Sequence, residues 1–193
     1  MYHLTSNKKT HQSADLIYHA LCELIKNKNI NSITIKELVE EAGVGRATFY
    51  RLFDSIEDVL HYKCDASFVD LRHYIIQFRK SEQLIGPTTS TDLLKPLLRF
   101  WYLDSFIIEI IIKINRLDIL MSNVESMFSI MFSQLDHNSN SDFQEEYFVS
   151  MRSGILFNIL VTWIKNKKDI PPDTLADILI KQSRAVENFE LLF

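Results

Sequence analysis

The chain has 193 residues, of which 47% are hydrophobic and only four are glycine, so it is long and apolar enough to bury a helical core. A net charge of −4 excludes a protein that is basic over its whole surface. Two cysteines, and six histidines without metal-ligand spacing, exclude a disulfide framework and a Cys/His metal centre. The polar N-terminus and the charges that interrupt residues 97–114 predict a reduced, cytoplasmic protein with no membrane span.

The first elements form a small basic region. Residues 1–7 are expected to be a loose tail, followed by a helix over about residues 10–26 and a polar connector at 27–31. Residues 1–53 carry seven Lys/Arg and five Asp/Glu, whereas the remainder carries 14 and 20. This asymmetry favours an N-terminal part that meets an anionic partner.

Residues 33–53, ITIKELVEEAGVGRATFYRLF, predict two short helices joined by a glycine turn. Thr34 and Glu37 have the spacing of a capping box, which satisfies backbone N–H groups at a helix start. Gly43 suits the left-handed residue that ends a helix, and Gly45 is acceptable as the next N-cap. Phe49 and Phe53 would share the inner face of the second helix.

The order of these residues closely resembles the helix-turn-helix of the TetR family of bacterial regulators. The matching residues, all at the family's spacing, are Thr34, Ile35, Leu38, Ala42, Gly43, Val44, Thr48, Phe49, Tyr50, Phe53, Ser55 and Glu57. The resemblance covers the first third of the chain and implies DNA binding. Three positions depart from it: Gly45 replaces a Ser or Thr, Leu52 a His or Tyr, and Ile56 a phosphate-binding Lys.

Polar side chains on the outer face of the second helix fit a DNA major groove. Arg pairs with guanine edges, Ala contacts a thymine methyl, and Thr and Tyr donate to phosphates. An ordinary helical turn with a solvated outer face is the plainer interpretation. The predicted DNA-binding residues are Thr34, Lys36, Gly45, Arg46, Ala47, Thr48, Tyr50 and Arg51.

The rest of the chain predicts a helical body. Ser55 and Asp58 would cap a fourth helix that runs to about residue 79, and Pro96 would mark the first turn of a later helix or a kink in it. The further helices are expected at about 92–103, 105–115, 118–135, 143–167 and 171–188, with loops at 81–91 and 136–142. We therefore predict an all-α fold with a DNA-binding domain at 8–68 and a ligand-binding and dimerisation domain at 69–193.

Small side chains recur every four residues in the helix expected at 143–167, where they would let a partner helix approach closely. The last two helices resemble the family's dimerisation pair, and their GIL…P pattern is similar to that of regulators of dihydroxyacetone kinase operons. Packing of both helices within one subunit is the alternative. The predicted interface residues are Ser150, Gly154, Asn158, Thr162, Leu175, Ile178 and Leu179.

Aromatic and polar residues of the body are candidates for an effector site, although such residues are more often core. The candidates are Phe68, His73, Trp101, Tyr102, Asn115 and Asn158. No phosphate-binding loop, nucleophile elbow or other catalytic motif occurs, so we expect neither an enzyme nor a cofactor.

The resemblance implies a homodimeric regulator that binds a palindromic operator, with repression relieved by a small-molecule effector. Two further hypotheses remain. The chain could be an activator of the same fold, or an interaction protein that holds a protein partner on DNA.

Overall fold

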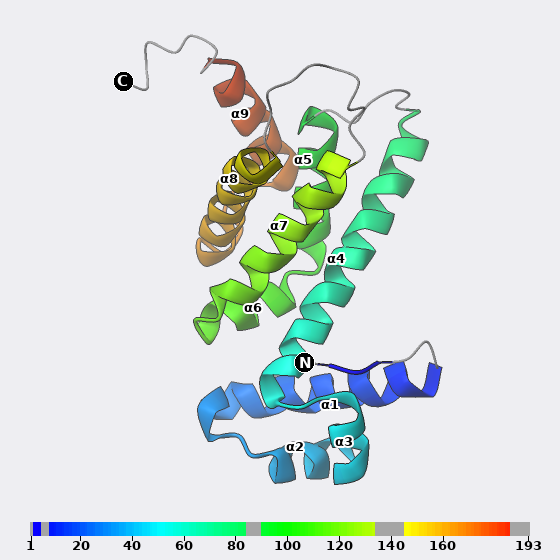
Figure 1. Ribbon diagram of the computed structural model, residues 1–193. Coiled ribbons are helices and arrows are strands. Elements are labelled where there is room, and N and C mark those ends of the chain that lie inside the picture. Colours follow the sequence, from blue (N-terminus) through cyan, green and yellow to red (C-terminus); the bar gives the residue numbers. More distant parts are fainter. Residues whose placement is uncertain (1, 5–7, 84–89, 134–144, 186–193) are drawn as a thin grey trace.

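The computed structural model describes residues 2–4, 8–83, 90–133 and 145–185 (Figure 1). Within them the secondary structure is helical, apart from an isolated bridge between Tyr2 and Phe53, so the all-α class is confirmed. The helices are α1 (Lys8–Asn27), the 3-10 turn η1 (Ile30–Ser32), α2 (Ile35–Ala42), α3 (Arg46–Leu52), α4 (Ile56–Ser81), α5 (Ser90–Leu103), α6 (Phe106–Lys113), α7 (Leu117–Ser133), α8 (Glu145–Lys165) and α9 (Pro172–Ala185).

The helices form a head and a body that share α4. The head contains α1, α2 and α3 at one end of the molecule, and α4 rises from it along the body (Figure 1). In the body α4 packs on α5 and α7, α8 packs on α7 and α6, and α9 packs on α5. Because α4 continues through residue 68, the boundary that the sequence predicts lies inside one unbroken helix.

Aromatic and aliphatic side chains fill both parts. In the head Phe49 and Phe53 are fully buried, and their rings lie 5.8 Å apart. In the body Trp101 is fully buried, with its ring 5.4 Å from that of Phe68. Tyr62 of α4 extends the head's aromatic cluster, with its ring 5.9 Å from that of Phe53.

The predicted helix starts are confirmed. Thr34 and Glu37 form a reciprocal capping box at α2, and Ser55 and Asp58 form another at α4. In each box the hydroxyl accepts from the backbone N–H three residues on, while the carboxylate accepts from the cap residue's own N–H. Both helices therefore begin where the residue spacing predicts.

Three helices end in the same hydrogen-bond pattern, a Schellman motif with one residue in the left-handed region. Gly43 at φ 64° ends α2, Asn115 at φ 58° ends α6 and Lys167 at φ 58° ends α8. At α8 the N–H of Lys167 donates to Ile164 O and that of Lys168 donates to Trp163 O, both at 2.9 Å. Gly and Asn adopt this conformation readily, whereas Lys adopts it at a steric cost.

The structure corrects several expectations. Residues 2–4 are not a loose tail, because His3 N–H donates to Leu52 O at 2.8 Å and Tyr2 Oη donates to Asp65 at 2.6 Å. The polar connector after α1 contains the turn η1, in which Asn29 accepts from Asn31 N–H. Pro96 lies in the middle of α5, so it does not mark the first turn. Predictions for residues 84–89, 136–142 and 186–188 lie outside the described residues.

Lys167→Gly should stabilise the protein. A left-handed L-residue costs about 1–2 kcal/mol, and the added backbone freedom of glycine returns about half of that, leaving a gain of about 0.5–1 kcal/mol. Thermal unfolding followed by circular dichroism measures the change. Lys165→Gly, in the last helical turn of α8, is the matched control and should destabilise. An unchanged or lower melting temperature for Lys167→Gly would contradict the assigned strain.

Candidate nucleic-acid interface

The short helix α3 has one buried and one exposed face. Phe49 and Leu52 are fully buried, whereas Tyr50 is 56% exposed. Arg46, Ala47 and Arg51 are exposed as well, and Thr48 is half-buried. The sequence-predicted division of this helix into an inner and an outer face is therefore confirmed.

The lysines and arginines of the head differ in whether their charged groups already have an acidic partner. Lys28 Nζ donates to Glu37 at 2.5 Å, and Lys36 lies 3.9 Å from Glu40, with both of these side chains well exposed. Arg46 and Arg51 have no polar partner within the described part of the chain. The two guanidiniums of α3 are therefore the side chains most ready to meet an anionic surface.

Glu37 is held in its charged form at the start of α2. Lys28 is the main cause, and the backbone and hydroxyl of Thr34 add to it, so that the pKa of this carboxyl falls to about 2. Thr34 is exposed, yet its hydroxyl already donates to Glu37 and accepts from the Glu37 N–H. The predicted role of Thr34 in DNA binding must therefore coexist with its capping role.

Two of the departures from the family pattern have a clear local setting. Gly45 is the N-cap of α3 at φ −74° without a side-chain cap, and a Cβ there would meet only Thr48 Oγ1, at 4.0 Å. A Ser would therefore fit at this position. Ile56 is partly buried and packs on the core at the first position of α4.

The N-terminal arm, residues 2–4, supports α3 in a way that the sequence did not reveal. His3 N–H donates to the carbonyl of Leu52, the last residue of α3. The ring of Tyr2 meets that of Tyr62 edge-on at 5.8 Å. Only the aromatic side chain of Tyr2 hinted at a packed arm, and one aromatic residue in a polar tail is a weak signal.

The residues predicted to bind an effector do not gather in one cavity. Phe68 and Trp101 pack together in the core, whereas His73 is exposed on α4. Asn115 is exposed and ends α6 in the left-handed conformation. Tyr102 stacks on Trp163, with the ring centres 6.2 Å apart.

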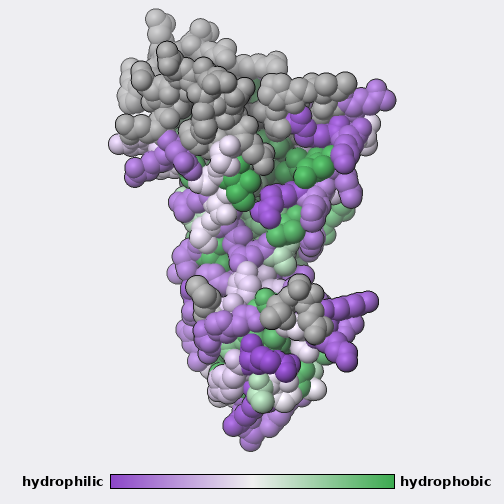
Figure 2. All heavy atoms as spheres, turned by 45° about the vertical axis from the view of Figure 1, so that its right-hand side comes forward, coloured by the Kyte–Doolittle hydropathy of each residue, from purple (hydrophilic) through white to green (hydrophobic). Residues whose placement is uncertain are grey.

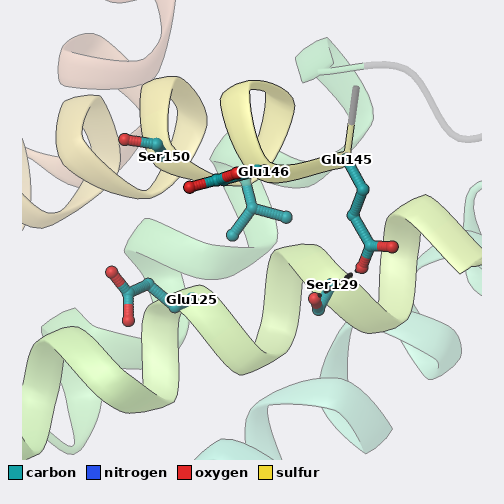
Figure 3. A pocket seen from close by; sticks show the side chains of 6 residues that line it. Glu125, Ser129, Glu145, Glu146 and Ser150 are labelled. Carbon is teal, nitrogen blue, oxygen red and sulfur yellow. Dashed lines mark hydrogen bonds between the residues drawn. The ribbon is translucent and has the colours of Figure 1, made fainter. Parts of the chain in front are cut away.

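Two surface hollows are lined by described residues. One, of about 530 Å³, lies between α7 and α8, where Glu125, Glu145 and Glu146 surround it (Figure 3). Ser129 Oγ donates to Glu145 there at 2.9 Å. The described residues hold no group of three side chains that could bind a metal ion.

The second hollow, of about 330 Å³, is a groove between α8 and α9. Four of the predicted interface residues line it, namely Asn158, Thr162, Leu175 and Leu179. Beside it, α8 exposes Tyr147, Met151 and Ile155, each by more than half. The predicted stripe therefore does not pack inside its own subunit: Ser150, Asn158 and Thr162 are exposed, and a Cβ at Gly154 would meet nothing within 4 Å.

The same helix passes a simple test of length and composition. Within the described ranges, α8 is the one helix long and apolar enough to cross a membrane, although only 33% of the tested stretch is buried. One such helix is weak evidence of a membrane, because helices of soluble proteins can have the same length and composition. Hydrophilic residues predominate on the visible face of the head, and apolar patches appear on the body (Figure 2).

Comparison with known proteins decides the family. The model of the bacterial regulatory proteins of the tetR family matches residues 17–62, which include α2, α3 and the start of α4. The N-terminal domain belongs to the TetR family. Regulators of this family bind DNA, typically as dimers, and are not enzymes. Residues 17–62 therefore correspond to the DNA-binding domain of these transcription regulators.

Solved structures extend the likeness of the fold over the whole chain. Lin0861 from Listeria innocua is 21% identical with a TM-score of 0.69, and the match covers 95% of this chain and 96% of that one. The fatty acid degradation regulator FadR from Bacillus halodurans is 15% identical with a TM-score of 0.52, covering 90% and 93%. No curated protein matches the chain.

Proposed function

We propose that the chain is a homodimeric repressor that binds a palindromic operator and is released by a small-molecule effector. The DNA-binding domain is residues 8–68, and the effector-binding and dimerisation domain is residues 69–193. The observation that carries the proposal is the outer face of α3, where two guanidiniums without a polar partner among the described residues lie beside exposed Ala47 and Tyr50.

The size and chemistry of α3 suit the major groove. Seven helical residues span about 10 Å, and the groove is about 12 Å wide. Arg46 lies at the start of the helix, where recognition helices approach base edges, and Arg51 lies in its last turn. We propose that Arg46 pairs with a guanine, that Ala47 contacts a base, and that Thr34, Lys36, Gly45, Thr48, Tyr50 and Arg51 position the helix against phosphates.

Arg46→Ala should weaken operator binding by about 1–3 kcal/mol and relax base preference at one position in each half-site. Binding-site selection followed by fluorescence anisotropy on the selected duplex measures both effects. Lys80→Ala, which removes an exposed charge from the far end of α4, is the control and should change neither. An unaltered sequence preference for Arg46→Ala would show that Arg46 contacts a phosphate or does not contact the DNA.

The exposed face of α8 supports a dimer. This helix is apolar on two sides: Leu156, Leu160 and Ile164 face the core, whereas Met151 and Ile155 face outward. A helix that is apolar all round calls for burial on both sides. We propose that a second copy covers the outer face together with Leu175, Ile178 and Leu179 of α9, which brings two heads to successive major grooves.

Gly154→Leu tests this interface, because within one subunit a Cβ added at Gly154 meets nothing within 4 Å. Across a two-fold axis the same clash occurs twice and costs about 1–3 kcal/mol for each copy. We expect monomers by analytical ultracentrifugation, lost operator binding and unchanged helical circular dichroism.

Ser126→Leu adds the same side chain to an exposed position of α7 and should leave the dimer intact. A parent protein that sediments as a monomer at micromolar concentration, or a Gly154→Leu dimer that binds DNA normally, would contradict the proposed interface.

Trp101 supports an effector site in the body. Its indole Nε1 is buried and has no hydrogen-bond partner among the residues that the structure describes. A buried unpaired donor costs about 1–3 kcal/mol, so a ligand that brings an acceptor to it binds with that cost removed. Trp163, by contrast, donates to Ile170 O at 2.9 Å. We propose that the effector is largely apolar and places a hydrogen-bond acceptor against Trp101.

Trp101→Phe should therefore reduce the small molecule that co-purifies with the protein, as measured by native mass spectrometry. Trp163→Phe, which removes an equal volume but a satisfied donor, should retain it. Equal occupancy in both variants would show that Trp101 is an ordinary core residue.

The activator and the protein-holding scaffold remain the competing functions. A cytoplasmic location with no membrane partner fits all three. Operator binding that an effector weakens favours the repressor. Binding that the effector strengthens favours the activator, and binding that ignores the effector but recruits a protein favours the scaffold.

A further inference from the structure

The turn between α8 and α9 holds two consecutive lysines in the left-handed region, Lys167 at φ 58° and Lys168 at φ 55°. The Schellman motif that ends α8 requires this conformation at Lys167 only. Nothing in the helix end requires it at Lys168, where a lysine seldom adopts it. Another contact must therefore hold Lys168, since strained residues persist only where their surroundings determine them.

That contact is made by the side chain of Lys168. Its ammonium donates to Ser105 Oγ at 2.6 Å and lies 3.4 Å from both Tyr102 O and Glu109 Oε1. Ser105 Oγ in turn donates to Glu109 at 2.5 Å. Ser105 is buried and precedes α6, and Glu109 lies in the first turn of α6. The α8–α9 turn is thus fastened to the N-terminal end of α6.

The other end of α6 is fastened to the head. Lys113, its last residue, donates to the carbonyl of Ile25 in the last turn of α1 at 3.0 Å. Arg116, just beyond α6, pairs with Glu57 in the first turn of α4 and with Asp118. The eight residues of α6 span about 12 Å and bury four isoleucines, so the helix moves as a rod rather than stretching.

We propose that α6 is a strut between the α8–α9 turn and the DNA-binding head, and that Lys168 is the residue that positions it. A change in how the α8–α9 pair packs against the second subunit then reaches the last turn of α1 through Lys168, α6 and Lys113. This gives the dimer interface its own influence on the head, separate from the effector. The inference rests on the proposed dimer and on DNA binding as the regulated event.

Amide hydrogen exchange of the full-length protein without DNA tests the strut directly. Lys168→Met keeps the aliphatic stem and removes the ammonium. We expect it to speed exchange in the last turn of α1, which includes the Lys28 N–H bonded to Leu24 O, by about 2- to 30-fold. Lys167→Met, beside it and equally left-handed but without a polar partner among the described residues, should leave α1 unchanged.

Ser105→Ala is the second variant, because it removes the acceptor from the α6 side and should produce the same faster exchange in α1. The strut is disproved if Lys168→Met and Ser105→Ala speed exchange only near residues 102–113 and 163–175. It is also disproved if Lys167→Met acts on α1 as strongly as Lys168→Met.

A double-mutant cycle separates transmission from local damage. Lys113→Met should speed exchange in α1 and make the further effect of Lys168→Met much smaller, because both break one path. Independent effects at sites this far apart would simply multiply the rates, and that result would overturn the proposal. Because the exchange experiments contain no DNA, a parent protein that binds no operator would refute the proposed function without changing the exchange rates expected for the strut.

Discussion

A helix as short as the seven residues of α3 is not stable alone in water, because the free-energy cost of nucleating a helix exceeds what one or two turns return. Burial of Phe49, Leu52 and Phe53 supplies the missing stability and also fixes which way the outer face points. The aromatic cluster continues through Tyr62 to Tyr2, so the N-terminal arm and α4 both support α3. The orientation of the outer face of α3 depends on this packing, since Arg46 and Arg51 have no polar partner among the described residues that would orient them.

The parts of the fold that the sequence predicts are those encoded within a few residues. The capping boxes of Thr34 and Ser55 join residues three apart, and Gly43 needs no partner to favour its conformation. Contacts that join distant segments left no local pattern. Tyr2 bonds to Asp65, Lys113 to Ile25 and Arg99 to Asp173. The partners lie 63, 88 and 74 residues apart in sequence, and no sequence pattern links residues at such distances.

The candidate effector site shows the same limit from another side. Residue type alone suggests Asn115 as an effector ligand, but its left-handed backbone conformation shows that it ends α6. Asn suits that position because its short polar side chain tolerates a positive φ. Phe68 and Trp101 are both aromatic and both buried, and hydrogen bonding separates them: the Phe68 ring has no polar atom, whereas the Trp101 indole N–H has no acceptor among the described residues. The spacing of the small residues on α8 predicts that they share a face, and Ser150, Asn158 and Thr162 are indeed exposed, while the interface that they are proposed to form stays a prediction.

Head and body are joined by two kinds of contact that respond differently to change. Along α4 they share one helix and a packed core, which transmits displacement because a close-packed interior has no slack. At the corner between α6 and α7 the joint is polar: Lys113 meets a helix-end carbonyl, Arg116 bridges Glu57 and Asp118, and Asn123 donates to Asp65 at 2.8 Å. Polar contacts at a partly exposed surface can break one at a time, each at modest cost. The corner is therefore where a displacement of α6 can change the angle between head and body, while the shared helix α4 keeps the two parts together.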